Sequence, residues 1–171
     1  AAKLMFSKGN LFERQRLLSQ VKPNETVVDM FAGIGYFSLA LAKRCKKVIA
    51  IEKNPLAFGY LKENIKLNRI SNMQPMIGDN RTTVLDGAAD RVMMGYFPGT
   101  QNFIPFAIKM LKNKGMIHYH NTYREGELWR KPLAELKKSF FGINYKIIGK
   151  KKVKSVAPRV YHVVLDVEVK K

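Results

Sequence analysis

The sequence predicts an α/β fold, in which a doubly wound, mostly parallel sheet ends in an antiparallel hairpin at one edge. Three observations lead to this prediction. Apolar runs typical of buried strands alternate with segments whose apolar residues are spaced for helices, as in a parallel sheet covered on both faces. A strand near the start of the chain runs into a glycine turn and a helix. Near the end, two segments that alternate apolar with polar residues flank Ala157-Pro158, which indicates an antiparallel pair.

The individual elements follow from local patterns. The first helix has apolar residues at helical spacing and stops before Pro23. Pro55 suits the first turn of a later helix, where a backbone N–H has no intrahelical partner in any case. Strands are expected at residues 26–31, 48–51, 74–77, 91–96, 115–120, 145–154 and 160–169. Helices are expected at residues 11–20, 36–43, 55–67, 103–111 and around 127–140.

The composition is that of a folded domain. Hydrophobic residues make up 46% of the 171 residues, which is enough for a packed core. No apolar run approaches the length needed to span a membrane, and no signal peptide is visible, so a cytoplasmic protein without membrane contact is expected. The single cysteine, Cys45, excludes an intrachain disulfide and a cysteine-based zinc site, and no metal is expected.

The charge is strongly one-sided. The chain has 31 Lys and Arg against 13 Asp and Glu, which gives a formal net charge of +18. This excess favours a polyanionic partner, because each phosphate that a Lys or Arg neutralises releases counterions. Solubility alone is the other explanation, although a modest charge of either sign would provide it. The run Lys150-Lys151-Lys152, with Lys154, either contacts phosphates or keeps an edge strand from pairing.

The sharpest local signal is the turn between the first expected strand and its helix. Asp29 ends the strand, and Gly33 and Gly35 precede the helix. Glycine permits a sharp turn and lets a ligand approach the backbone without a Cβ in the way. Ser38 stands where the dinucleotide fingerprint G-x-G-x-x-G requires glycine, and no Lys-Ser/Thr pair of a P-loop follows. A tight turn without a ligand is an equal alternative for this segment alone.

Two further strand ends carry polar residues that strengthen the ligand interpretation. Glu52 ends the second strand about twenty residues on, where a carboxylate that binds ribose hydroxyls is expected. Asp79 and Asn80 follow the third strand; Asp79 could accept from an adenine amino group, and the Asn80 backbone could donate. A solvated glutamate and an ordinary turn are the alternatives. Together the three strand ends predict a crevice at the carboxyl edge of the sheet, where open α/β sheets bind ligands.

Three stretches of the chain resemble a known group of enzymes. They are the glycine turn from Asp29 to Ser38, the segment from Phe6 to Asn10 with Glu13 and Arg14, and the tail from Val153 to His162. All three resemble the archaeal and eukaryotic transferases that act on the purine beside the tRNA anticodon. This group contains the tRNA guanine-N1 methyltransferases and the wybutosine-pathway enzymes that transfer an aminocarboxypropyl group.

The resemblance implies a class I methyltransferase fold with S-adenosylmethionine as donor and tRNA, specifically the anticodon loop of phenylalanine tRNA, as partner. It implies a helical motif at residues 1–22 that contributes to the cofactor site, and a Rossmann-like catalytic domain at residues 23–171. Relatives carry additional N-terminal sequence before the motif that begins at Phe6, and we expect this sequence to lack that tRNA-binding part. The matching N-terminal motif makes Ser7 and Arg14 candidates for holding the amino-acid end of the donor, although Arg14 also suits a solvated basic helix face. A monomer is expected.

The two activities of the group can be weighed from the fourth strand end. The methyltransferase branch carries an Asn-Leu-Pro type motif there, whereas this chain reads from Met94 to Pro98 without an Asn or Asp. That departure favours aminocarboxypropyl transfer, with guanine-N1 methylation and a non-catalytic RNA-binding protein as alternatives. His118 and His120 face the same way on a strand, which favours a hydrogen-bonded structural pair, with a catalytic base as the alternative. No catalytic residue is assigned.

Overall fold

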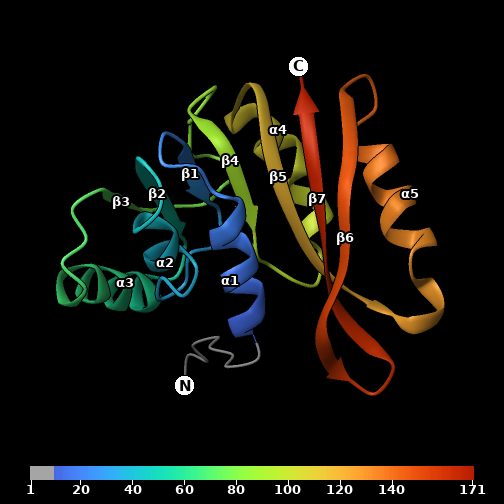
Figure 1. Cartoon of the computed structure of the whole chain (residues 1–171), viewed down its shortest axis with the longest axis horizontal. Helices are drawn as coiled ribbons and strands as arrows, with labels where there is room; N and C mark the ends of the chain where they lie inside the picture. Colours follow the sequence, from blue (N-terminus) through green and yellow to red (C-terminus); the bar gives the residue numbers. More distant parts are fainter. Residues whose placement is uncertain (1–9) are drawn as a thin grey trace.

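The structure, a computed structural model, describes residues 10–171, and this part of the chain forms one seven-stranded sheet in the order β3-β2-β1-β4-β5-β7-β6 (Figure 1). Five strands run parallel to one another: β1 (Thr26–Asp29), β2 (Lys47–Glu52), β3 (Met73–Ile77), β4 (Ala89–Met94) and β5 (Leu111–Arg124). β7 (Val160–Lys170) runs antiparallel to β5, and β6 (Asn144–Ala157) runs antiparallel to β7. The predicted fold class, including the antiparallel edge hairpin, is confirmed.

Helices cover both faces of the sheet. α1 (Leu11–Gln20), α2 (Ser38–Ala42) and α3 (Pro55–Leu67) pack on one face, where Leu17, Leu41 and Leu61 share a buried cluster with strand residues. α4 (Ile104–Met110) and α5 (Arg130–Ser139) pack on the other face. The β-branched and apolar residues of the central strands are buried on both sides for this reason. None of the described helices has the length and apolar character that crossing a bilayer requires.

Several predicted boundaries were wrong. β1 ends at Asp29 and α2 begins at Ser38, because the chain between them turns through two glycines with positive φ, Gly33 and Gly35. β5 extends to Arg124 instead of ending at His120, because β7 pairs with it along its whole length. The other expected elements form, with ends shifted by a few residues.

The strands β5, β7 and β6 continue past the end of β4. Met94, the last residue of β4, lies opposite Tyr119 of β5. Residues 120–124 of β5 extend beyond that level and pair with residues 160–164 of β7. In Figure 1 this part projects below the parallel strands. The extension therefore lies at the carboxyl edge of the sheet, where the cofactor crevice was predicted.

A buried ionic network joins α1 to β7. Asp166 of β7 accepts hydrogen bonds from Arg16 Nη1 at 2.5 Å, from Gln20 Nε2 at 3.2 Å and from His118 Nδ1 at 2.6 Å. Arg16 also donates to Glu13, with Nε and Nη2 at 2.8 and 2.7 Å from its carboxylate oxygens. The first helix is thus held to β7 by partly buried charged and polar contacts.

His118 is the centre of this network rather than a catalytic base. Its Nε2 lies 2.6 Å from Arg91 Nη1, and Arg91 in turn donates to Glu25. Burial lowers the pKa of His118, so the neutral ring accepts from Arg91 and donates from Nδ1 to Asp166. Burial would raise the pKa of Asp166, but the bonds from His118 and Arg16 hold that pKa below its usual range.

Candidate cofactor site

Asp29 closes the loop between β1 and α2. Its carboxylate accepts hydrogen bonds from Ser38 Oγ at 2.5 Å and from the Phe31 backbone N–H at 3.2 Å. The side chain is 4% exposed, and burial raises the pKa of Asp29 to about 6, against the opposing effect of these hydrogen bonds. Asp29, a predicted site residue, is therefore enclosed by the loop and fixes its shape through these two hydrogen bonds.

The raised pKa of Asp29 makes stability depend on pH. A carboxyl with a higher pKa in the folded state binds its proton more tightly there, so stability should fall as pH rises through the range between about 4 and 6. Asp29→Asn removes this titration. Relative to the wild-type protein, the variant should gain about 2 kcal/mol of unfolding free energy between about pH 4 and pH 7. Urea unfolding of both proteins at the two pH values measures the gain, and a difference that does not change with pH would contradict it.

The two glycines of the loop have different roles. Gly33 has φ +56° and faces open space, since no atom of residues 10–171 other than its chain neighbours lies within 4 Å of a Cβ built there. Gly35 has φ +94°, and its Cβ would lie 2.9 Å from Leu61 Cδ1 and 3.0 Å from Leu39 Cδ1. Gly33 therefore leaves room for a ligand to approach the backbone. Gly35 is instead required for close packing of the loop against α2 and α3.

Glu52 ties the loop to the end of β2. Its Oε2 accepts from the Gly33 N–H at 2.7 Å and its Oε1 accepts from the Asn54 N–H at 2.7 Å. The Asn54 side chain in turn caps α3 by accepting from the Leu56 N–H at 3.0 Å. Each carboxylate oxygen retains a second lone pair. Glu52 is half-buried at the carboxyl edge, so lone pairs are left for two vicinal hydroxyls, and its role in binding ribose stays a prediction.

Asp79 is engaged by cations. Arg81 Nε and Lys53 Nζ each donate to its carboxylate at 2.9 Å, and Arg81 Nη2 donates at 2.6 Å. The hydrogen bonds from Arg81 and Lys53 hold the pKa of Asp79 well below its usual range. An adenine amino group, the predicted partner, would have to displace one of these bonds or share an oxygen with it.

Asn80 was predicted to offer its backbone N–H to a ligand, and the structure shows that its side chain also makes a contact. The side chain is 5% exposed, and its Nδ2 donates to the Met30 carbonyl of the loop after β1. Its Oδ1 is buried without a hydrogen-bond partner. Asn80 thus links the strand-three turn to the strand-one loop. With the bonds from Gly33 to Glu52 and from Lys53 to Asp79, it brings three strand ends together as predicted.

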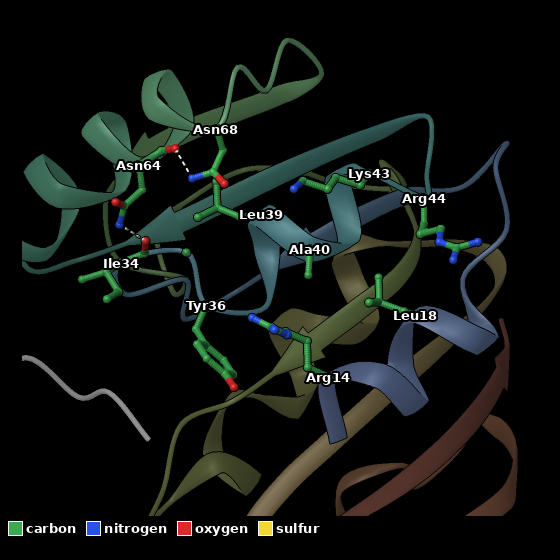
Figure 2. Close-up of a pocket in the computed structure, with 11 residues that line it drawn as sticks. Arg14, Leu18, Ile34, Tyr36, Leu39, Ala40, Lys43, Arg44, Asn64 and Asn68 are labelled. Carbon is green, nitrogen blue, oxygen red and sulfur yellow. Dashed lines mark hydrogen bonds between the residues drawn. The ribbon is translucent and has the colours of Figure 1, made fainter. Parts of the chain in front are cut away.

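Arg14 reaches the same loop from α1. Its guanidinium lies 4.8 Å from the centroid of the Tyr36 ring, just after Gly35. Figure 2 shows it pointing towards α2 in an open cleft of about 450 Å³. Lys43 and Arg44 stand at the far end of this cleft, which is lined by Arg14, Leu18, Ile34, Gly35, Tyr36, Leu39, Ala40, Lys43, Arg44, Asn64 and Asn68. Ser7, the other candidate for the donor's amino-acid end, lies outside the described residues.

An aromatic cluster at the site was not predicted as a unit. Phe31 stacks on Tyr96 with centroids 5.0 Å apart, and Phe103 meets both rings edge-on. Tyr96 remains 48% exposed, so its ring lies outside the core and is available for stacking against a planar ligand. The sequence showed the aromatic residues, but their meeting depends on loops that follow β1 and β4.

A second group that the sequence did not reveal is the pairing of His120 with His162. His120 Nδ1 lies 2.9 Å from His162 Nε2, and the His162 ring packs against Phe97 with centroids 4.8 Å apart. Burial lowers the pKa of His162 to about 4 and that of His120 well below its usual value. Both rings are therefore neutral at pH 7. The predicted structural pair of His118 with His120 is replaced by this one, because β7 places its own histidine beside β5.

Comparison with known proteins gives a consistent family. The TRM5/TYW2 methyltransferase domain model matches residues 1–148. The tRNA(Phe) (4-demethylwyosine(37)-C(7)) aminocarboxypropyltransferase of Methanocaldococcus jannaschii is 48% identical over 169 residues, which cover 96% of this chain and 68% of the relative. The tRNA (guanine(37)-N(1))-methyltransferase Trm5b of Pyrococcus abyssi is 36% identical, with 98% of this chain and 51% of the relative covered.

Solved structures agree with these relatives. The crystal structure of M. jannaschii TYW2 in complex with AdoMet has a TM-score of 0.91 at 46% identity, with 99% of this chain and 80% of that chain covered. The crystal structure of P. horikoshii TYW2 in complex with MeSAdo has a TM-score of 0.93 at 45% identity, with 100% and 66% covered. Since the family model matches most of the sequence and the fold is shared, this chain belongs to the TRM5/TYW2 methyltransferase domain family.

Proposed function

We propose that this chain transfers the 3-amino-3-carboxypropyl group of S-adenosylmethionine to a wyosine-type precursor base beside the anticodon of phenylalanine tRNA. The observation that carries this is the 48% identity to an aminocarboxypropyltransferase of that specificity over nearly the whole chain. A TYW2 relative of nearly equal similarity binds MeSAdo, the methylthioadenosine that remains once the aminocarboxypropyl group has left. Action on tRNA is consistent with a cytoplasmic enzyme.

The residues at the carboxyl edge fit the donor. Bound S-adenosylmethionine supplies a sulfonium with three attached carbons, and the carbon that is presented in line determines the product. Glu52 has free lone pairs for ribose hydroxyls, and Gly33 leaves its backbone open beside it. Binding at this edge keeps the adenosine half fixed by the loops after β1, β2 and β3. Selection of the carbon then depends on what holds the amino-acid end.

Arg14 is the described residue best suited to hold that end. Its guanidinium lies on the Tyr36 ring beside the cofactor loop, and a planar fork can bind an α-carboxylate through two parallel hydrogen bonds. The ionic network between α1 and β7 fixes the helix that carries it. Ser7 remains a proposed second contact on the basis of the sequence motif.

The loop after β4 supports this reaction over methylation. Met94 is buried, and the following residues up to Pro98 contain no Asn or Asp. Tyr96 stacks on Phe31 and stays half-exposed, which provides an aromatic surface in place of a polar group for a guanine edge. Stacking on exposed aromatic rings is how proteins commonly hold bases that have left a helix or loop.

The spent donor decides between the activities. Incubation of the wild-type protein with S-adenosylmethionine and tRNA that carries the wyosine-type precursor should release methylthioadenosine, as measured by chromatography. Accumulation of S-adenosylhomocysteine without methylthioadenosine would establish the guanine-N1 methyltransferase alternative. The observation behind that alternative is the 36% identity to Trm5b. Calorimetry that detects no binding of S-adenosylmethionine would leave a non-catalytic RNA-binding protein.

Substitution of Arg14 tests its role. Arg14→Ala should lower the rate of aminocarboxypropyl transfer by ~10-fold or more, the scale of a lost hydrogen bond to a charged group, and should lower donor affinity less, because Glu52 still holds the ribose. Arg14→Lys should not restore the rate, since Lys lacks the planar fork. Arg44→Ala, at the far end of the same cleft, is the matched control. Equal losses in the Arg14 and Arg44 variants would contradict the assignment.

A further inference from the structure

The part of the sheet that extends beyond β4 is strongly basic. We call it the basic arm: residues 120–124 of β5 together with residues 150–164, which form the outer parts of β6 and β7 and the turn between them. These two ranges contain six cationic residues and no carboxylate, namely Arg124, Lys150, Lys151, Lys152, Lys154 and Arg159. All of them except Lys154 are exposed. The arm projects from the edge of the sheet at which the parallel strands end (Figure 1).

Two of the lysines make cation–π contacts with aromatic rings. Lys150 Nζ lies 5.8 Å from the centroid of the Trp129 ring, and Lys152 Nζ lies 4.4 Å from that of Tyr161. The register places Lys150 opposite Leu165 and Lys152 opposite Val163, so both project from the α5 side of the sheet. These weak contacts favour side-chain positions on that face, so less side-chain freedom is lost when a ligand binds there.

The nearby carboxylates do not cancel this charge. Glu125 approaches Lys152 at 4.0 Å and accepts from the Tyr161 hydroxyl at 3.4 Å, but Glu125 itself is 52% exposed. Glu127 is already paired with Lys131 at 2.8 Å. An exposed pair such as that of Glu125 with Lys152 is weak in water, and a phosphate can replace the carboxylate. The arm thus keeps a net positive field.

We propose that the basic arm binds the phosphodiester backbone of the RNA whose base enters the cofactor site. This inference rests on the proposed function, because it takes the substrate to be a base within an RNA loop. An RNA loop presents its phosphates on either side of the reacting base, and the arm adjoins the loops of the site, where the Phe37 ring lies 6.1 Å from that of His120 and the Phe97 ring 4.8 Å from that of His162. Dense cations interleaved with aromatic rings are typical of surfaces that bind single-stranded RNA.

The alternative role of these lysines is to protect an edge strand. β6 is the outermost strand of the sheet, and lysines on such a strand discourage pairing with another molecule. That role predicts self-association when the lysines are removed, with unchanged RNA affinity. RNA binding by the lysines predicts weaker RNA affinity without self-association. One set of variants therefore distinguishes the two roles.

The test measures binding of a synthetic anticodon stem-loop RNA by fluorescence anisotropy over a range of salt concentrations. Lys150→Gln with Lys152→Gln should weaken binding by ~10-fold at low salt and reduce the slope of log affinity against log salt by about 1.5, for two lost phosphate contacts. Lys137→Gln with Lys138→Gln makes the same charge change on two exposed residues in the last turn of α5, at the other end of that helix from Trp129. This control should leave the slope nearly unchanged.

Further measurements keep the arm and the proposed function distinguishable. Calorimetry with S-adenosylmethionine should give the same affinity for both double variants and the wild-type protein. Equal RNA affinities for the arm variant and the wild type would overturn the proposal that the arm binds RNA. This holds even if the wild type releases methylthioadenosine. In another outcome, the wild type releases only S-adenosylhomocysteine while the arm variant binds RNA more weakly than the wild type. That result would support RNA binding by the arm and would reject aminocarboxypropyl transfer. Self-association of the arm variant with normal RNA binding would assign the lysines to edge protection.

Discussion

Replacing Asp166 with alanine is expected to lower the free energy of unfolding by about 3–5 kcal/mol, the usual result of removing one partner from a buried ionic contact. Asp166 is 4% exposed and accepts from Arg16, Gln20 and His118. Its loss leaves the Arg16 guanidinium beside the neutral His118 ring, with Glu13 as its remaining carboxylate partner. Urea unfolding followed by circular dichroism at pH 7 measures the change.

The control for Asp166 lies on the same strand. Glu168 is exposed two residues further along β7, and Glu168→Ala should change stability by no more than about 0.5 kcal/mol. Asp166→Asn keeps the size and one acceptor oxygen, so its cost should fall between the two. If Asp166→Ala unfolds within about 1 kcal/mol of the wild type, the network does not fix α1, and the positioning of Arg14 needs another cause.

Gly35→Ala should be the most damaging single-methyl change in the cofactor loop. The new Cβ would lie 2.9 Å from Leu61 Cδ1 and 3.0 Å from Leu39, on a backbone with φ +94°. Overpacking costs about 1–3 kcal/mol and a left-handed backbone about 1–2 kcal/mol for a residue other than glycine. The sum predicts a loss of about 2–5 kcal/mol in stability and, because the loop must shift, weaker donor binding. Thermal unfolding and calorimetry with S-adenosylmethionine check the two effects.

Gly33→Ala separates backbone strain from crowding. Gly33 also has positive φ, +56°, but no atom of the described residues other than its chain neighbours lies within 4 Å of the position that the new methyl group would take. We expect a stability loss of about 1–2 kcal/mol from the backbone alone. Donor affinity should still fall in this variant, because the methyl would occupy the open approach to the loop. Equal stability losses for the two variants would show that the contacts of Gly35 with Leu39 and Leu61 are unimportant.

The sequence was sufficient for the fold class because its signals are local. The spacing of apolar residues and the glycine turn mark strands and helices without knowledge of distant partners. The positions of Glu52 and Asp79 followed from the same argument, since successive parallel strands end at one edge of the sheet. Those predicted residues meet through direct bonds between loops.

The features that escaped prediction depend on partners far apart in the chain. Arg16 and Asp166 are separated by 150 residues, and His120 finds His162 only because β7 lies beside β5. The last residues of β5, from Asn121 to Arg124, carry no clear alternation and become strand by pairing with β7. Ser38 had served only to exclude a dinucleotide fingerprint, yet it is the partner of the buried Asp29.

The place of β7 between β5 and β6 also sets the order in which the protein can be completed during synthesis. Both neighbours of β7 leave the ribosome before it does, and Asp166, which fastens α1, lies within β7 itself. Until then β5 has one open side, β6 has no partner and the first helix cannot lock. Such non-local pairing is slow and leaves strand edges exposed. A nascent chain stalled before Val160 should therefore be a target for chaperones and proteases, whereas the arrival of β7 completes the sheet and fixes α1.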